Sequence, residues 1–153
     1  MKKMVYLIAA IFLFLLVIFA VLSGISRKTP ERGMVDGRLR PCPGAPNCVC
    51  SETPESPFFV EPLDFTEPPR EAWVRVKGLV QSLGGRIEIE EEGYLRVVFA
   101  TKILRFRDDV ELRMETERSR IHIRSASRVG YSDFGQNRKR AEKIRAGFTQ
   151  KQE

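Results

Sequence analysis

The chain has 153 residues, of which 42% are hydrophobic and 30% are charged, and its formal net charge is +6. This length is sufficient for one small domain and excludes two large ones. The sequence has no Gly-x-y period and no heptad run, and large apolar residues recur to its end, which excludes collagen, a coiled coil and wholesale disorder.

Charge is distributed unevenly along the chain. Residues 55–117 carry 14 acidic and 9 basic side chains, whereas residues 118–147 carry 2 acidic and 9 basic ones. An acidic segment followed by a basic one predicts either internal ion pairing or a basic patch that is open to an anionic partner. Nucleic acid is not the partner we expect, because the sequence contains no nucleic-acid-binding motif.

Residues 4–22 form an apolar run without a charged side chain. At a rise of about 1.5 Å per residue, a helix of this length can cross the hydrocarbon core of a membrane. A cleaved signal peptide is the alternative, but its apolar stretch is usually only about 7–15 residues long, and no good small-x-small site follows here. We therefore predict an uncleaved transmembrane anchor over residues 1–25, which contacts membrane lipid through residues 4–25.

Residues 26–67 are rich in proline and predict an irregular linker. Within it, Cys42 and Cys48 enclose five residues that include proline, glycine and asparagine, a composition that favours a tight turn. Such a turn can bring two cysteines to disulfide distance. We predict a Cys42–Cys48 disulfide with Cys50 free. A metal site built from these three cysteines and His122, or three free thiols, are the alternatives.

The orientation of the anchor depends on the cysteines. Basic residues flank the apolar run on both sides in nearly equal number, so the positive-inside rule does not decide between the two orientations. A disulfide requires an oxidising compartment. We therefore expect a single-pass protein with its N-terminus in the cytoplasm and its C-terminal domain in the periplasm or on the outer face of the cell envelope.

Residues 68–153 predict an α+β globular domain. Apolar residues at helical spacing, preceded by two prolines and followed by two glycines, predict a helix over residues 69–83. Alternating apolar and polar residues predict four strands, and a further helical segment follows them. The strands are expected over residues 86–90, 94–101, 109–115 and 120–127, and the last helix over residues 134–148. Short connections favour a four-stranded antiparallel sheet with both helices on one face.

The register of the last two strands follows from their alternation. Opposite partners on the helix-covered face are expected to be Val110 and Ser125, Leu112 and Ile123, and Met114 and Ile121. Partners on the other face are then Glu111 and Arg124, Arg113 and His122, and Glu115 and Arg120. In this register, opposite charges meet across the strands.

Three motifs carry a family resemblance. Residues 124–138 read RSASRVGYSDFGQNR, a DDVE run stands at residues 108–111, and CPGAPNC stands at residues 42–48. Together they resemble the bacterial and plastid family catalogued as domain of unknown function 1499. The resemblance covers residues 42–147 and departs at Cys50, where the family pattern leads us to expect serine. It implies a fold and a compartment and no particular activity.

The candidate binding residues come from the long motif and the acidic pair upstream of it. They are Asp108, Asp109, Arg124, Ser125, Ser127, Arg128, Tyr131, Asp133, Asn137 and Arg138. A strand end, a loop and a helix N-terminus can converge on an anion. Alternatively, the three aspartates pair with the three arginines in one polar cluster that locks the last hairpin to the last helix. The sequence leaves both interpretations open.

Catalysis has little support in the sequence, and we predict no catalytic residue, metal or cofactor. His122 is the single histidine, and on an alternating strand it faces away from Ser125. No phosphate loop, metal-ligand spacing or nucleophile elbow is present. We expect an uncharacterised membrane-anchored envelope protein that acts as a non-catalytic binding or structural module, with an envelope protein or an anionic ligand as its partner. A protein that binds a small anion or a lipid, or an unrecognised envelope enzyme, is the alternative.

Overall fold

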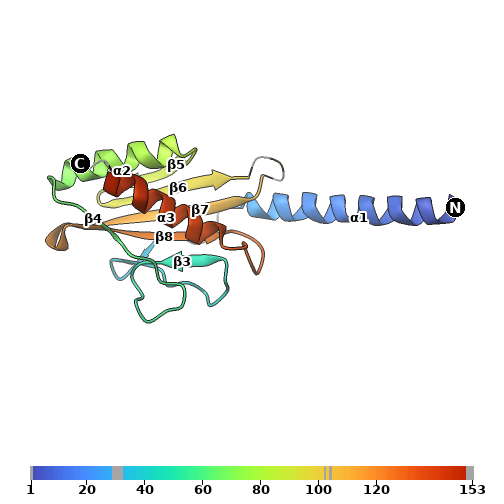
Figure 1. Ribbon diagram of the computed structural model, residues 1–153, viewed down its shortest axis with the longest axis horizontal. Helices are drawn as coiled ribbons and strands as arrows, with labels where there is room; N and C mark the ends of the chain where they lie inside the picture. Colours follow the sequence, from blue (N-terminus) through green and yellow to red (C-terminus); the bar gives the residue numbers. More distant parts are fainter. Residues whose placement is uncertain (1, 29–32, 102, 104, 151–153) are drawn as a thin grey trace.

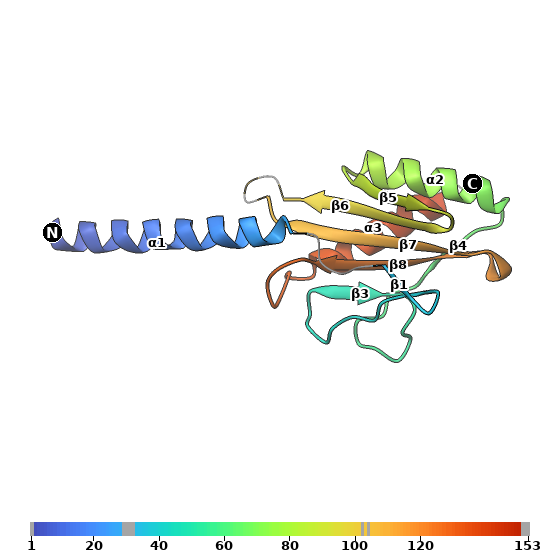
Figure 2. The ribbon, with the colours of Figure 1, turned by 180° about the vertical axis from the view of Figure 1, so that it is seen from behind.

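A computed structural model describes residues 2–28, 33–101, 103 and 105–150, so residues 29–32 of the predicted linker and residues 151–153 of the predicted domain lie outside the described residues. Helix α1 (Lys2–Ser26) projects from one end of the domain as a straight extension (Figures 1 and 2). Its mean hydropathy reaches 3.2, and it is long and apolar enough to cross a membrane by length and composition.

The main sheet has six strands, and all of its ladders are antiparallel. Its strands are β3 (Cys48–Cys50), β4 (Leu63–Asp64), β5 (Arg86–Glu91), β6 (Tyr94–Ala100), β7 (Arg107–Glu115) and β8 (Arg120–Ser127). The order is β3-β8-β7-β6-β5, and β4 also pairs with β8. A 3-10 turn, η1 (Thr116–Arg118), connects β7 to β8, and β1 (Met34–Val35) and β2 (Arg38–Leu39) form a separate hairpin.

The predicted four-stranded sheet was therefore wrong by two strands. Both additional strands, β3 and β4, come from the proline-rich segment and pair with β8. Without them, β8 would be an edge strand with a row of unpaired backbone N–H and C=O groups. Strands of two and three residues are too short to show an alternating pattern, so periodicity could not reveal them.

Helices α2 (Pro69–Ser82) and α3 (Gln136–Thr149) cover one face of the sheet, as predicted (Figure 1). Proline at the first position of α2 is compatible with the helix because its missing N–H has no intrahelical partner there. At Gly85, which follows α2, an added Cβ would lie 2.5 Å from Val97 Cγ1, so glycine permits the close approach to β6. The core between helices and sheet includes Val76, Val80, Leu95, Val97, Leu112, Ile123, Ile144 and Phe148.

The predicted register of β7 and β8 is confirmed at every position. Leu112 lies opposite Ile123, and Glu111 lies opposite Arg124. Of the three cross-strand pairs expected on the face away from the helices, Glu111 and Arg124 form an ion pair at 2.7 Å. Arg113 instead binds Glu52, a residue of the proline-rich segment.

The proline-rich segment also packs against the face of the sheet that the helices leave uncovered. Leu39, Cys50 and Tyr94 form a small apolar cluster there, with Cys42 and Ile89 packed against it. The uncovered face is thereby partly buried by chain that precedes the predicted domain. This packing explains why polar side chains on that face can be as inaccessible to solvent as those beneath the helices.

The predicted disulfide between Cys42 and Cys48 is present, with a Cα–Cα distance of 5.6 Å. Cys50 is free and fully buried in β3. Because the disulfide uses two of its four ligands, the alternative metal site of three cysteines and His122 is not formed. Burial raises the pKa of the Cys50 thiol, so this thiol stays protonated at mildly alkaline pH.

We expect the native protein to resist iodoacetamide at pH 8, and the unfolded, non-reduced protein to take up one label, at Cys50. The reason is that the reactive thiolate is disfavoured by burial and the other two cysteines are joined. Peptide mapping without reductant measures the label at each cysteine. Labelling of Cys42 or Cys48, or a bridge that includes Cys50, would contradict this pairing.

Candidate functional site

The sheet divides the long motif between its two faces. Side chains alternate along β8, so Ser125 and Ser127 face the helices, whereas Arg124 faces the other side, where Arg128 also lies. The single polar cluster that we predicted is therefore wrong: the same residues form two clusters on opposite sides of the sheet. The period of two along a strand makes this separation unavoidable once β8 extends to Ser127.

Glu111 is at the centre of the cluster on the face away from the helices. It is fully buried, and its two oxygens accept hydrogen bonds from Arg124 Nη1 (2.7 Å), the Tyr94 hydroxyl (2.8 Å) and the backbone N–H of Gly33 (2.7 Å). Burial and the neighbouring Glu111 carboxylate raise the pKa of Tyr94, so its hydroxyl remains a donor. Arg124 is thus neutralised inside the fold.

Arg128 belongs to the same cluster and binds Asp109 in a bidentate manner. Its Nε lies 2.9 Å from Asp109 Oδ2, its Nη2 lies 2.7 Å from Asp109 Oδ1, and Nη2 also lies 3.2 Å from Glu88 Oε2. The Arg128 side chain is only 1% exposed. Burial by itself lowers the pKa of Arg128, but the bonds and charges of Asp109 and Glu88 outweigh it and raise that pKa. We refer to Asp109, Glu111, Arg124 and Arg128 as the β7–β8 ion-pair cluster.

The second cluster lies between the sheet and α3 and is centred on Asn137. The Asn137 amide accepts from the Ser125 hydroxyl (2.6 Å) and from Arg140 Nη1 (2.7 Å), and it donates to Ser127 Oγ (2.9 Å). Arg140 also binds Asp108 at 2.7 Å. This Asn137 cluster, formed by Asp108, Ser125, Ser127, Asn137 and Arg140, attaches α3 to β7 and β8. Arg140 was not among the candidate residues from the sequence.

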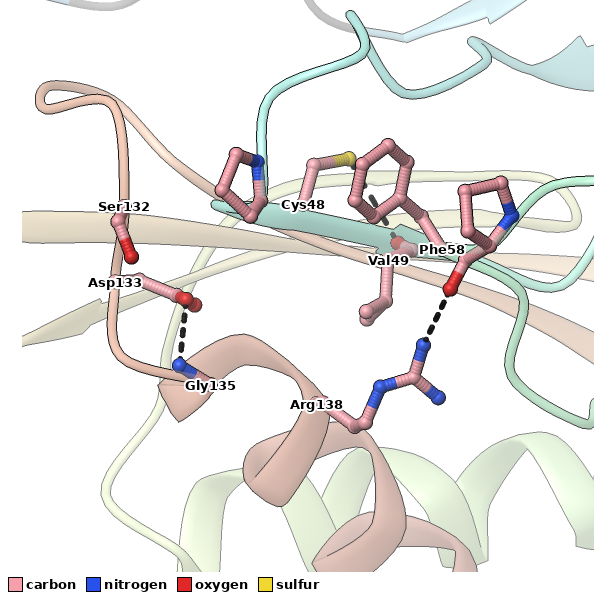
Figure 3. Close-up of a pocket in the computed structure, with 9 residues that line it drawn as sticks. Cys48, Val49, Phe58, Ser132, Asp133, Gly135 and Arg138 are labelled. Carbon is pink, nitrogen blue, oxygen red and sulfur yellow. Dashed lines mark hydrogen bonds between the residues drawn. The ribbon is translucent and has the colours of Figure 1, made fainter.

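The start of α3 borders a cavity of about 250 Å³ between this helix, β3 and the segment around Phe58 (Figure 3). The Asp133 carboxylate accepts from the backbone N–H of Gly135 (2.8 Å) and of Asn137 (2.6 Å). Arg138 reaches across the cavity to the carbonyls of Phe59 (2.8 Å) and Pro57 (3.1 Å). The donors that could attract an external anion at this helix N-terminus are therefore bound to the protein's own oxygens.

The remaining candidate, Tyr131, is 77% exposed and lies on the loop between β8 and α3, outside both clusters. The structure thus brings seven of the ten candidate residues into the two clusters, while Asp133 caps α3 and Arg138 binds two carbonyls of the proline-rich segment. This arrangement can fix the positions of β7, β8 and α3 relative to one another.

The sequence did not identify the partners of His122. Ser51 Oγ lies 3.1 Å from His122 Nδ1, and Glu115 Oε2 lies 2.9 Å from His122 Nε2. Serine, histidine and glutamate in this order invite comparison with a nucleophile and its base. However, Ser51 is buried, and its hydroxyl already accepts the backbone N–H of Ile123 at 2.9 Å. These hydrogen bonds attach the residue that follows β3 to β8. Ser51 and His122 are 71 residues apart in the sequence, so no local sequence pattern relates them.

The fold is an antiparallel sheet with two helices on one face, joined to an apolar N-terminal helix. The chain belongs to the family described as "Protein of unknown function (DUF1499)", which matches residues 38–148. This match confirms the resemblance seen in the sequence. No curated protein shows a significant match to the chain.

We expect Arg128→Gln to lower the melting temperature by about 10 °C, because it removes the bidentate charged pair between Arg128 and the buried Asp109 carboxylate, at a cost of about 3 kcal/mol. Arg145→Gln is the matched control, since Arg145 forms an exposed pair with Glu142 and should shift the melting temperature by no more than about 2 °C. Differential scanning calorimetry measures both. An unchanged or higher melting temperature for Arg128→Gln would instead favour an anion site.

We also expect a pH-dependent contribution from Glu115. The hydrogen bond from His122 lowers the pKa of Glu115, so this contribution to stability is present above the usual carboxyl range and is lost as the pH falls through the lowered value. Glu115→Gln should therefore lower the melting temperature at pH 6, and the difference from the unsubstituted protein should shrink as the pH falls. The neighbouring, exposed Glu117→Gln serves as control. A difference that does not shrink on acidification would refute this linkage.

Proposed function

We propose that the protein is a non-catalytic, membrane-anchored module of the cell envelope whose α+β domain is held directly against the outer surface of the membrane. The observation that carries the proposal is the junction between α1 and the domain. Ser26, the last residue of α1, is fully buried, and its hydroxyl accepts the backbone N–H of Arg107 at 2.7 Å. Phe19 of α1 also contacts Phe106, with ring centroids 6.4 Å apart.

This junction supports close apposition of domain and membrane. A helix followed by a flexible tether would leave the domain free to move away from the bilayer. Here the end of α1 hydrogen-bonds to the first residue of β7, so the apolar helix and the sheet are joined at both a polar and an aromatic contact. The loops at this end of the domain are then the parts that face the membrane.

The disulfide supports placing the domain outside the cytoplasm, because disulfides persist in oxidising compartments. The internal pairing of the motif supports a structural role for that motif. Arg124 and Arg128 each bind a buried carboxylate, so an external anion at these arginines would have to compete with existing ion pairs. The burial of Ser51 argues against a nucleophilic role for its hydroxyl.

We expect the full-length protein to resist alkaline extraction from membranes and to retain its N-terminal methionine and lysines. Protease added to spheroplasts should digest the C-terminal domain, whereas in inverted vesicles the domain should be protected. A soluble cytoplasmic protein, intact in the spheroplasts, serves as the control for sealed membranes. A mature N-terminus near Ser26 would refute the anchor, and a domain protected in spheroplasts would refute the orientation.

A further inference from the structure

A cavity of about 360 Å³ lies where α1 meets the domain, and Asp108 and Ser127 of the Asn137 cluster form part of its polar lining. Phe19 and Leu22 of α1 form one wall, and Phe106, Val129 and Phe134 contribute apolar side chains from the loops that follow β6 and β8. Hydroxyl, amide and charged residues complete the lining. Its volume is in the range of small-molecule sites.

The cavity lies at the depth of the membrane interface. Phe19 and Leu22 belong to the uncharged run of residues 4–22, so the α1 wall of the cavity lies within the segment expected to cross the hydrocarbon core. Figure 2 shows the loop between β8 and α3 at the same end of the sheet as the attachment of α1. A lipid chain could therefore reach this wall without passing through water.

The conformation and exposure of Phe134 indicate that this end of the domain contacts an apolar partner. Its ring is 88% exposed, and its backbone is left-handed, with φ of +54°, which is unfavourable for a bulky side chain. The backbone N–H of Phe134 donates to Ser132 Oγ and that of Gly135 donates to Asp133 Oδ1, and these bonds hold the loop in this conformation. Exposure and backbone strain both cost free energy, and a ligand that covers the ring would offset the first of these costs.

The charged residues that line the cavity indicate whether a phosphate or a cationic group of a lipid fits its polar part. Two acidic residues line it, but Asp108 binds Arg140 and Asp133 binds the first N–H groups of α3. Arg107 is the basic residue among the lining residues. The polar part of the cavity therefore suits a phosphate ester next to Arg107 better than a cationic group.

We propose that this junction cavity binds one phospholipid of the bilayer, with an acyl chain against Phe19, Leu22 and Phe134 and the phosphate toward Arg107. The inference rests on the membrane anchor proposed above. The lipid would act as a wedge that fills the space between the anchor and the domain. It would also place the loop between β8 and α3 in the membrane interface, where aromatic side chains are favoured.

The test compares Phe134→Asn with Tyr131→Asn in the full-length protein. Both residues are exposed aromatics on one loop, but Phe134 lines the cavity and Tyr131 does not. Each protein is incubated in dodecyl maltoside micelles that contain dioleoyl phosphatidylethanolamine and dioleoyl phosphatidylglycerol, and native mass spectrometry measures the fraction that carries one phospholipid. Asparagine tolerates a positive φ, so Phe134→Asn should melt at an unchanged or higher temperature.

We expect the unsubstituted protein and Tyr131→Asn to retain one phospholipid, and Phe134→Asn to retain about fivefold less. Three results would overturn the proposal: no bound phospholipid on the unsubstituted protein, equal loss in both variants, or equal retention in all three. Equal retention in all three proteins would indicate that the lipid binds around α1 alone. If the unsubstituted protein carries no phospholipid and is a dimer, a second copy of the chain fills the cavity. Alkaline extraction tells the two proposals apart, because a failed anchor releases the protein, whereas an empty cavity does not.

Discussion

Two fully buried carboxylates on β7, Asp109 and Glu111, impose the charge requirement that the rest of the domain satisfies. A buried carboxylate is tolerated only when a cation and further donors surround it. The antiparallel register supplies Arg124 opposite Glu111, and the end of β8 supplies Arg128 to Asp109. A slip of one residue would move both carboxylates into the apolar layer beneath the helices, so charge pairing and apolar packing enforce the same register.

The motif that identifies the family is continuous in the sequence but is divided in space. Its arginines on one face of the sheet hold β7 to β8, while its serines and Asn137 on the other face hold α3 to the same strands. Because these groups already bind one another, the motif contributes to the architecture of the domain. A space that could receive a ligand lies at the junction with α1, where Ser127, Val129 and Phe134 of the same motif are among the lining residues.

That junction fixes the orientation of the N-terminal helix relative to the domain. Ser26 ends the helix inside the domain, so the direction of α1 and the direction of the sheet are coupled through the bond to Arg107 (Figures 1 and 2). In the proposed arrangement, the loop between β8 and α3 lies in the membrane interface, and contact with lipid stabilises it. The exposed rings of Tyr131 and Phe134 are consistent with such a surface.

The sequence alone determined the features that depend on local pattern. The apolar run predicted α1, alternation predicted β5 to β8 and the β7–β8 register, and the proline-rich turn predicted the disulfide between Cys42 and Cys48. The tertiary structure decided which distant segments meet. It alone joined β3 and β4 to β8, placed Ser51 beside His122 and opened the cavity next to α1. These contacts depend on long-range packing, which short strands and isolated polar residues do not encode in any local period.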